Sequence, residues 1–159
     1  MSIPMRLAQY LRQRGVDYEI CAHRMSQTSF ETARTAHIPP QQLAKSVILE
    51  DDAGPVMAVV PADQAVMLGR LMRLLGRHDL HLADERSIAA QFEECNPGAV
   101  PSVGMAWDIE TIVDDTLDAS ATVYLETGDH ERLLRLTHDQ FHRLMSDRYL
   151  GHFSKPLRH

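Results

Sequence analysis

Two apolar runs joined by an acidic turn constrain the fold of this chain most strongly. Residues 44–49 and 55–61 are rich in Val, Ile, Leu and Met, and the acidic and Gly residues at 50–54 separate them. Runs of this length around such a turn predict a β-hairpin whose strands are covered on both faces. Outside the turn, Lys45 is the only charged residue of the segment. Its ammonium either extends into water at a strand end or serves a site there.

Length and composition predict a single domain that spans residues 1–159. The chain is 44% hydrophobic and 24% charged, and no apolar run approaches the roughly 20 residues that cross a bilayer. The first residues lack the basic and apolar regions of a secretory signal, and Cys21 and Cys95 form no metal or disulfide pattern. We therefore expect a cytoplasmic protein with no membrane partner.

The net charge of −6 argues against a protein that coats nucleic acid nonspecifically, and we expect no DNA partner. A local basic face is still compatible with this charge. Arg70, Arg73 and Arg77 follow the i, i+3, i+7 spacing of one helix side, which is either a solvated face or a surface for RNA backbone. A short basic tail begins at about residue 147 and contains Arg148, Lys155 and Arg158.

Apolar periodicity and capping signals predict the remaining elements. The expected helices cover residues 4–14, 28–36, 65–75, 84–92 and 137–145. A short strand is expected at 18–22, and a second hairpin at 121–126 and 132–136. Because strands and helices alternate irregularly, we expect an α+β fold with a mixed sheet or an open barrel, not a doubly wound parallel sheet.

Residues 96–104 carry two prolines and two glycines and predict a shaped loop. The small residues Gly98, Ala99 and Ser102 would let a ligand approach the backbone closely. Such a loop can aim N–H groups at an oxyanion, although an ordinary connection between two elements has the same composition. The sequence of this loop does not separate the two interpretations.

Histidines and serines give weaker signals for chemistry. The pairs His138/His142 and His78/His81 each offer two ligands, but no further Cys or His completes either set. There is no Gly-x-Ser-x-Gly elbow, and neither glycine of the 96–104 loop is followed by the Gly-Lys-Ser/Thr of a nucleotide-binding loop. We therefore expect no metal and no other cofactor.

Several motifs taken in order form a more specific pattern than any one of them. They are His23, Thr28, Pro-Pro-Gln-Gln-Leu-Ala-Lys-Ser-Val at 39–47, Pro-Ala-Asp at 61–63, Pro-Gly-Ala-Val-Pro at 97–101, Gly104, Gly128 and Leu-Thr-His-Asp-Gln-Phe at 136–141. Over roughly residues 5–146 this set resembles the YbaK/ProX family, freestanding relatives of the editing domain in bacterial prolyl-tRNA synthetases. The resemblance implies a mixed, barrel-like sheet flanked by helices. It also implies hydrolysis of the ester that joins a wrong amino acid to tRNA.

The resemblance places the family's essential lysine at Lys45 and its Gly-x-x-x-Pro loop at Gly98 to Ser102. Here the sequence departs from the family, because Ser102 replaces the proline and Pro101 stands one position earlier. We expect Lys45 and Gly98 to be catalytic and Arg70, Arg73 and Arg77 to bind tRNA. The residues expected to contact the substrate are His23, Ser46, Ala99, Val100, Pro101, Ser102 and His130.

The chemistry of an aminoacyl ester limits what Lys45 can do. The ester carries an α-ammonium that a protonated lysine would repel, so we expect Lys45 to orient the terminal nucleotide through its phosphate or ribose. N–H groups of the Gly98 loop would stabilise the oxyanion, and water would be the nucleophile. His23 and His130 are the candidates for a general base.

We expect a trans-editing deacylase for a small mischarged residue, namely Ala, Ser, Thr or Cys. Its substrate partner would be aminoacyl-tRNA, and an aminoacyl-tRNA synthetase is a further candidate partner. Ser46 or Ser102 would favour a hydroxylated side chain. Two alternatives stay open at this point: a noncatalytic module of the same fold that binds tRNA or a synthetase, and a hydrolase of small acyl esters unrelated to RNA.

Overall fold

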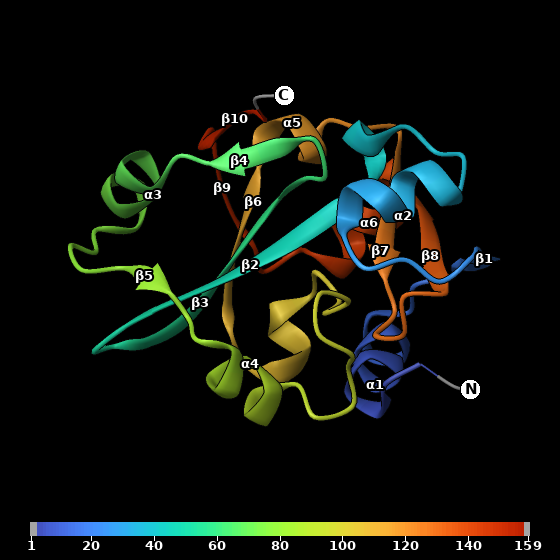
Figure 1. Cartoon of the computed structure of the whole chain (residues 1–159), viewed down its shortest axis with the longest axis horizontal. Helices are drawn as coiled ribbons and strands as arrows, with labels where there is room; N and C mark the ends of the chain where they lie inside the picture. Colours follow the sequence, from blue (N-terminus) through green and yellow to red (C-terminus); the bar gives the residue numbers. More distant parts are fainter. Residues whose placement is uncertain (1–2, 158–159) are drawn as a thin grey trace.

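The computed structural model describes residues 3–157, and in them helices and strands intermix in an α+β fold (Figure 1). The five-stranded sheet has the order β5 (His81–Leu82), β2 (Ala44–Asp51), β3 (Gly54–Pro61), β6 (Glu110–Asp114) and β9 (Tyr149–Gly151). A three-stranded sheet contains β1 (Glu19–Ala22), β8 (Arg132–Thr137) and β7 (Thr122–Glu126), and a two-stranded one contains β10 (Ser154–Pro156) and β4 (Gln64–Val66). The expected mixed sheet is confirmed, since β6 runs parallel to β3 and β9 whereas β2 and β3 are antiparallel. The described strands lie in three separate sheets, so the barrel-like detail is not confirmed.

The helices begin and end at recognisable signals. They are α1 (Met5–Arg14), α2 (Ser29–Thr35), α3 (Leu68–Leu75), α4 (Glu85–Gln91), α5 (Asp115–Asp118) and α6 (His138–Leu144), with short 3-10 turns η1 (Pro40–Gln42) and η2 (Gly104–Trp107). Gly15 ends α1 in the left-handed conformation, and the Thr28 hydroxyl accepts the Glu31 N–H at the start of α2. Thr137 and Gln140 form a capping box at α6. Within the described residues, no helix has the length and apolar character that spanning a membrane requires.

The predicted central hairpin is confirmed. β2 pairs with β3 from Ala44 opposite Pro61 to Asp51 opposite Gly54. Alternate residues of β3 enter different cores, because successive side chains of a strand point to opposite faces. The residues at 56, 58 and 60 pack with Leu71 of α3, whereas those at 57 and 59 join the larger core around Phe141. Both faces of the hairpin are therefore covered.

Long-range pairing accounts for the differences from the predicted elements. The helix expected at 65–75 begins only at Leu68, because residues 64–66 form β4 and pair with β10. Residues 149–156, within the expected basic tail, form β9 and β10, while Arg158 lies outside the described residues. The strands β5, β6, β9 and β10 and the short helix α5 were not expected. The four strands are brief, and the strands with which they pair lie far away in the sequence.

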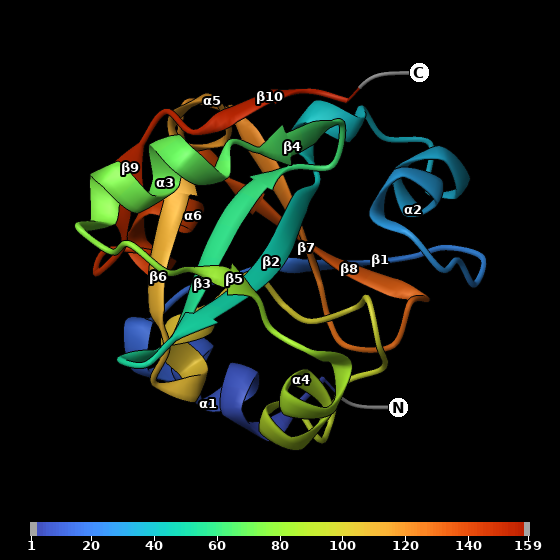
Figure 2. The same cartoon turned by 60° about the vertical axis from the view of Figure 1, so that its left-hand side comes forward.

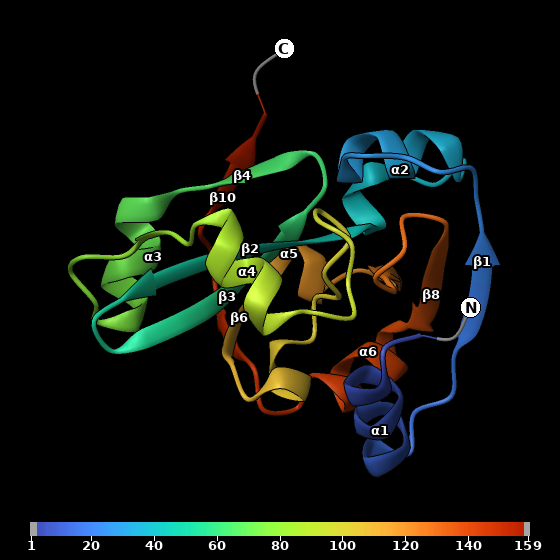
Figure 3. The same cartoon turned by 60° about the horizontal axis from the view of Figure 1, so that its bottom comes forward.

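The arrangement of the elements places the loop at 96–104 beside the start of β2. Figures 2 and 3 show this loop, drawn in yellow, between α4 and the end of the hairpin that lies near α2. The helix α3 covers the hairpin on the side away from α2 (Figures 1 and 3). The start of β2, the loop, α2 and α4 therefore surround one region of the surface.

Candidate functional site

One pocket contains both Lys45 and Gly98. It has a volume of about 240 Å³, and its walls come from the start of α2, from β2, from α4, from the 96–104 loop and from the end of β7. The residues that line it are Gln27, Thr28, Ser29, Lys45, Ser46, Ile48, Ile88, Gly98, Val100 and Glu126. Four of the residues predicted for the site are thus brought together, namely Lys45, Ser46, Gly98 and Val100.

The Lys45 side chain is held in place and not extended into water. Its Nζ donates a hydrogen bond of 2.6 Å to the backbone carbonyl of Gln64, the first residue of β4. Burial lowers the pKa of this lysine from its ordinary value, and the charge of Asp63 opposes that change. Two of the three ammonium donors remain for a ligand, since only one is used within residues 3–157.

Ser46 links the lysine strand to the loop. Its hydroxyl donates a hydrogen bond of 3.0 Å to the carbonyl of Val100. The donor that was expected to favour a hydroxylated substrate is therefore committed to the backbone, although the same oxygen can still accept. This contact fixes the distance between β2 and the loop at the pocket wall.

The backbone of the loop has the properties expected of a close-approach site. Gly98 has a φ of +80°, and a Cβ there would lie 3.2 Å from the Gln27 carbonyl oxygen and 3.3 Å from Cε1 of His130. The N–H of Ala99 donates to the Asn96 carbonyl at 3.1 Å. The N–H groups of Gly98 and Val100 make no hydrogen bond to the described part of the chain, and both residues line the pocket.

The two histidines considered as general bases lie outside the pocket lining. His130 packs behind Gly98, and its Nε2 donates to the carbonyl of Pro97. The ring Nδ1 of His23 lies 2.6 Å from the Arg24 carbonyl oxygen, and the backbone N–H of His23 donates to the Glu131 carbonyl. Their contacts support the loop and the neighbouring turn, and the second ring nitrogen of each, His23 Nε2 and His130 Nδ1, is buried without a hydrogen-bond partner among the described residues.

The rest of the predicted substrate-contacting set also lies outside the lining. Ala99, Pro101 and Ser102 are buried residues of the loop and do not line the pocket. Ser102 has no exposed surface, and its hydroxyl has no hydrogen-bond partner among the described residues. The expected role of Ser102 in selecting a side chain does not fit this position. The serine acts instead within the packing under the loop.

The three arginines predicted to bind tRNA do not share one helix face. The helix α3 ends at Leu75 with Gly76 in the left-handed conformation, so Arg77 lies beyond the helix and does not share a face with Arg70 and Arg73. Arg77 pairs with Asp51 and Glu110, each at 3.2 Å, at the turn of the central hairpin. That turn is about 20 Å from Lys45 along β2. None of the three arginines lines the pocket.

Glu126 is a site residue that the sequence analysis missed. It is the last residue of β7, only 2% exposed, and it lines the pocket. Neither carboxyl oxygen has a hydrogen-bond partner among the described residues. Burial raises the pKa of Glu126 to about 7; the Thr32 hydroxyl opposes this change and the charge of Asp129 adds to it. The only signal in the sequence is a carboxylate at the end of an otherwise apolar strand.

A second hollow of about 390 Å³ adjoins the Lys45 pocket. It shares Ile88, Gly98 and Val100 with that pocket, and Phe92 and Pro97 form part of its wall. Glu85 and Glu93 also line it, so acidic groups stand beside its apolar surface.

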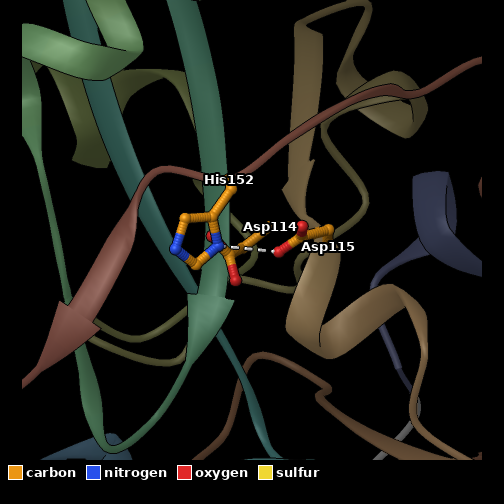
Figure 4. Close-up of side chains that lie close together, drawn as sticks. All are labelled: Asp114, Asp115 and His152. Atoms are coloured by element: carbon orange, nitrogen blue, oxygen red, sulfur yellow. Dashed lines mark hydrogen bonds and ion pairs between the residues drawn. The ribbon is translucent and has the colours of Figure 1, made fainter.

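Away from the pocket, Asp114, Asp115 and His152 bring three ligand-type groups together (Figure 4). Asp114 is fully buried, and both of its oxygens accept from the protein: one from the Phe153 N–H, the other from the N–H and hydroxyl of Thr116. Asp115 and His152 form an exposed ion pair of 2.9 Å. Capping of α5 and attachment of the C-terminal segment account for this cluster.

Comparisons with known proteins identify the family of this chain. Residues 23–144 match the model of the family described as "Aminoacyl-tRNA editing domain". The chain belongs to this family. The resemblance to YbaK-type editing domains is thereby confirmed. No curated protein matches the sequence.

Solved structures share the fold of this editing domain. A candidate trans-editing enzyme for prolyl tRNA synthetase superposes with a TM-score of 0.82 at 21% identity, covering 97% of this chain and 99% of that one. The hypothetical protein APE2540 has a TM-score of 0.81 at 20% identity, with 94% and 99% covered. A candidate signal transduction protein from Marinobacter aquaeolei VT8 gives 0.75 at 22% identity; the match covers 96% of this chain but 31% of that longer chain.

Proposed function

We propose that this chain is a trans-editing deacylase that hydrolyses the ester between a small mischarged amino acid and tRNA. The observation that carries the proposal is the pocket that Lys45 shares with Gly98 and Val100, whose N–H groups have no partner among the described residues. Membership of the editing-domain family supplies the substrate class. The amino acid in the proposed substrate is a small one, namely Ala, Ser, Thr or Cys.

The Lys45 pocket and the hollow beside it suit different parts of such a substrate. Lys45, fixed by the Gln64 carbonyl, offers its remaining donors to a phosphate or ribose oxygen and thereby orients the terminal nucleotide. The second hollow, which contains Phe92, is suited to the terminal adenosine. This division favours an ester of RNA over an untethered acyl ester.

The reaction is a water-dependent ester cleavage. Water adds to the carbonyl carbon, negative charge develops on the carbonyl oxygen, and the bond to the ribose oxygen breaks as that oxygen takes up a proton. The N–H groups of Gly98 and Val100 donate to the developing oxyanion, and such preorganised donors lower the barrier. Because an aminoacyl ester is already labile, positioning supplies much of the rate enhancement.

The test is a panel of tRNAs charged with Ala, Ser, Thr or Cys and with larger residues, assayed with the wild type, Lys45→Ala and Lys155→Ala. Lys155 is exposed on β10 and is the matched control. We expect hydrolysis of small residues by the wild type and by Lys155→Ala, and a loss on the order of 100-fold in Lys45→Ala. Circular dichroism and thermal unfolding check that each variant folds.

Three results would contradict the proposal. A folded Lys45→Ala protein that deacylates at the wild-type rate removes the role of Lys45. Binding of tRNA without any hydrolysis indicates the noncatalytic module. Equal hydrolysis of a free amino-acid ester and of the tRNA ester indicates a hydrolase unrelated to RNA.

A further inference from the structure

A buried carboxyl group without a partner forms part of the pocket wall. Glu126 is 2% exposed, and both of its carboxyl oxygens lack a hydrogen-bond partner within residues 3–157. Burying a carboxylate without a partner costs several kcal/mol or forces it to take up a proton, so such a group in a folded protein requires an explanation. A ligand that enters the pocket can supply the missing partner.

The cations nearest to Glu126 in the fold bind other groups. Lys45 donates to the Gln64 carbonyl and forms no ion pair with Glu126. The guanidinium of Arg132 is bound by Asp129, with Nε and Oδ2 2.8 Å apart. The Thr32 hydroxyl, on the buried side of α2, lies beside Glu126 and lowers its pKa, and it also shares a hydrogen bond with the Ser26 hydroxyl. Glu126 therefore lines the pocket with no cationic partner among the described residues.

The charges of Lys45 and Glu126 favour one orientation of a substrate in the pocket. An ammonium is repelled by Lys45 and attracted by Glu126, whereas a phosphate or ribose oxygen prefers Lys45. A substrate with an ammonium beside its carbonyl carbon satisfies both preferences when its carbonyl lies between the two residues, next to the Gly98 loop. A charge-assisted hydrogen bond from the ammonium also supplies the partner that the carboxylate lacks.

We propose that Glu126 is the substrate-binding residue that accepts the α-ammonium of the aminoacyl group. This inference rests on the deacylase function proposed above and deepens it. Glu126 makes the enzyme selective for esters with a free α-ammonium. Esters in which a hydroxyl replaces the ammonium, or in which the nitrogen is acylated, gain no such contact.

The test compares two esters of one tRNA, alanyl-tRNA and lactyl-tRNA, which differ in the α-ammonium and α-hydroxyl. If serine is the preferred residue, seryl-tRNA and glyceryl-tRNA form the equivalent pair. Rates are divided by spontaneous hydrolysis of each ester, because the ammonium itself activates the carbonyl. The proteins are the wild type, Glu126→Gln and Glu131→Gln, the last being an exposed neighbour that serves as control.

We expect the wild type to accelerate hydrolysis of the aminoacyl ester at least tenfold more than that of the hydroxyacyl ester. Glu126→Gln should lose at least tenfold in kcat/KM, mainly through KM, on the aminoacyl ester and change less than twofold on the hydroxyacyl ester. Glu131→Gln should match the wild type. Thermal unfolding checks that Glu126→Gln is folded.

An equal loss on both esters would overturn the inference, because Glu126 would then act on the water or on the fold. Unchanged rates on both esters would overturn it as well. If the wild type accelerates neither ester, the deacylase function itself fails, and this inference fails with its premise.

Discussion

At the scale of single residues, Gly98 is the position where the site depends most directly on the absence of a side chain. Its φ of +80° strains any other residue, and a Cβ would crowd Gln27 and His130. We predict that Gly98→Ala destabilises the fold by about 1–2 kcal/mol and reduces deacylation at least tenfold, because the loop amides move. Urea unfolding and single-turnover deacylation measure the two effects.

Gly69 is the matched control for this change. It lies in α3, away from the pocket, and a Cβ there meets no atom within 4 Å. Alanine at this helical position should leave activity unchanged and stabilise the protein by about 0.5–1 kcal/mol. If Gly98→Ala behaves like Gly69→Ala in both assays, the loop backbone has no part in the reaction.

At the scale of elements, Asp114 joins β6, α5 and the C-terminal segment. It accepts the Thr116 N–H at 3.2 Å and the Phe153 N–H at 2.9 Å from a fully buried position. We predict that Asp114→Ala lowers the free energy of unfolding by about 2–4 kcal/mol, the sum of a lost cap and an unsatisfied buried donor. Asp115→Ala breaks only an exposed ion pair with His152 and should cost less than about 1 kcal/mol. Equal losses in urea unfolding would contradict the structural role of Asp114.

Local sequence signals predicted the elements whose partners are close in the chain. The hairpin at 44–61 and the second hairpin, β7 and β8, needed only apolar runs and turn residues. The apolar periodicity predicted the first turn of a helix where β4 lies, because the partner of β4, β10, lies about 90 residues later. The arginine spacing fails for a local reason, because Gly76 ends α3 one residue before Arg77.

At the scale of the whole molecule, the sequence brought Lys45 and Gly98 together only through the ordered family pattern. The fold adds a pocket residue, Glu126, that the family pattern did not contain. Glu126 enters the pocket because β7 ends beside α2 (Figure 1), an arrangement that depends on contacts between distant segments. Ser102 was assigned to the substrate because it lies in the motif, yet its burial is decided by the packing under the loop. Motifs thus predicted the location of the site, whereas burial decided which residues face into it.

Glu126 also links the site to the stability of the whole protein. Its pKa is about 7 in the folded state against an ordinary value of 4.5, so the folded protein holds this proton more tightly than the unfolded chain does. Stability from this group is therefore lost as the pH rises from about 4.5 to about 7, and the loss above pH 7 reaches roughly 3 kcal/mol. Glu126→Gln removes the charge and should abolish this contribution.

We therefore predict that Glu126→Gln is more stable than the wild type at pH 8, by up to roughly 3 kcal/mol, and within about 1 kcal/mol of it at pH 5. Urea unfolding of both proteins at the two pH values measures the difference, and Glu131→Gln controls for removing a surface charge. A difference that is the same at pH 5 and pH 8 would show that the carboxyl of Glu126 is not destabilised by burial. A variant that gains stability at pH 8 while losing its preference for the α-ammonium would show that the site retains a charge the fold disfavours, because the substrate requires it.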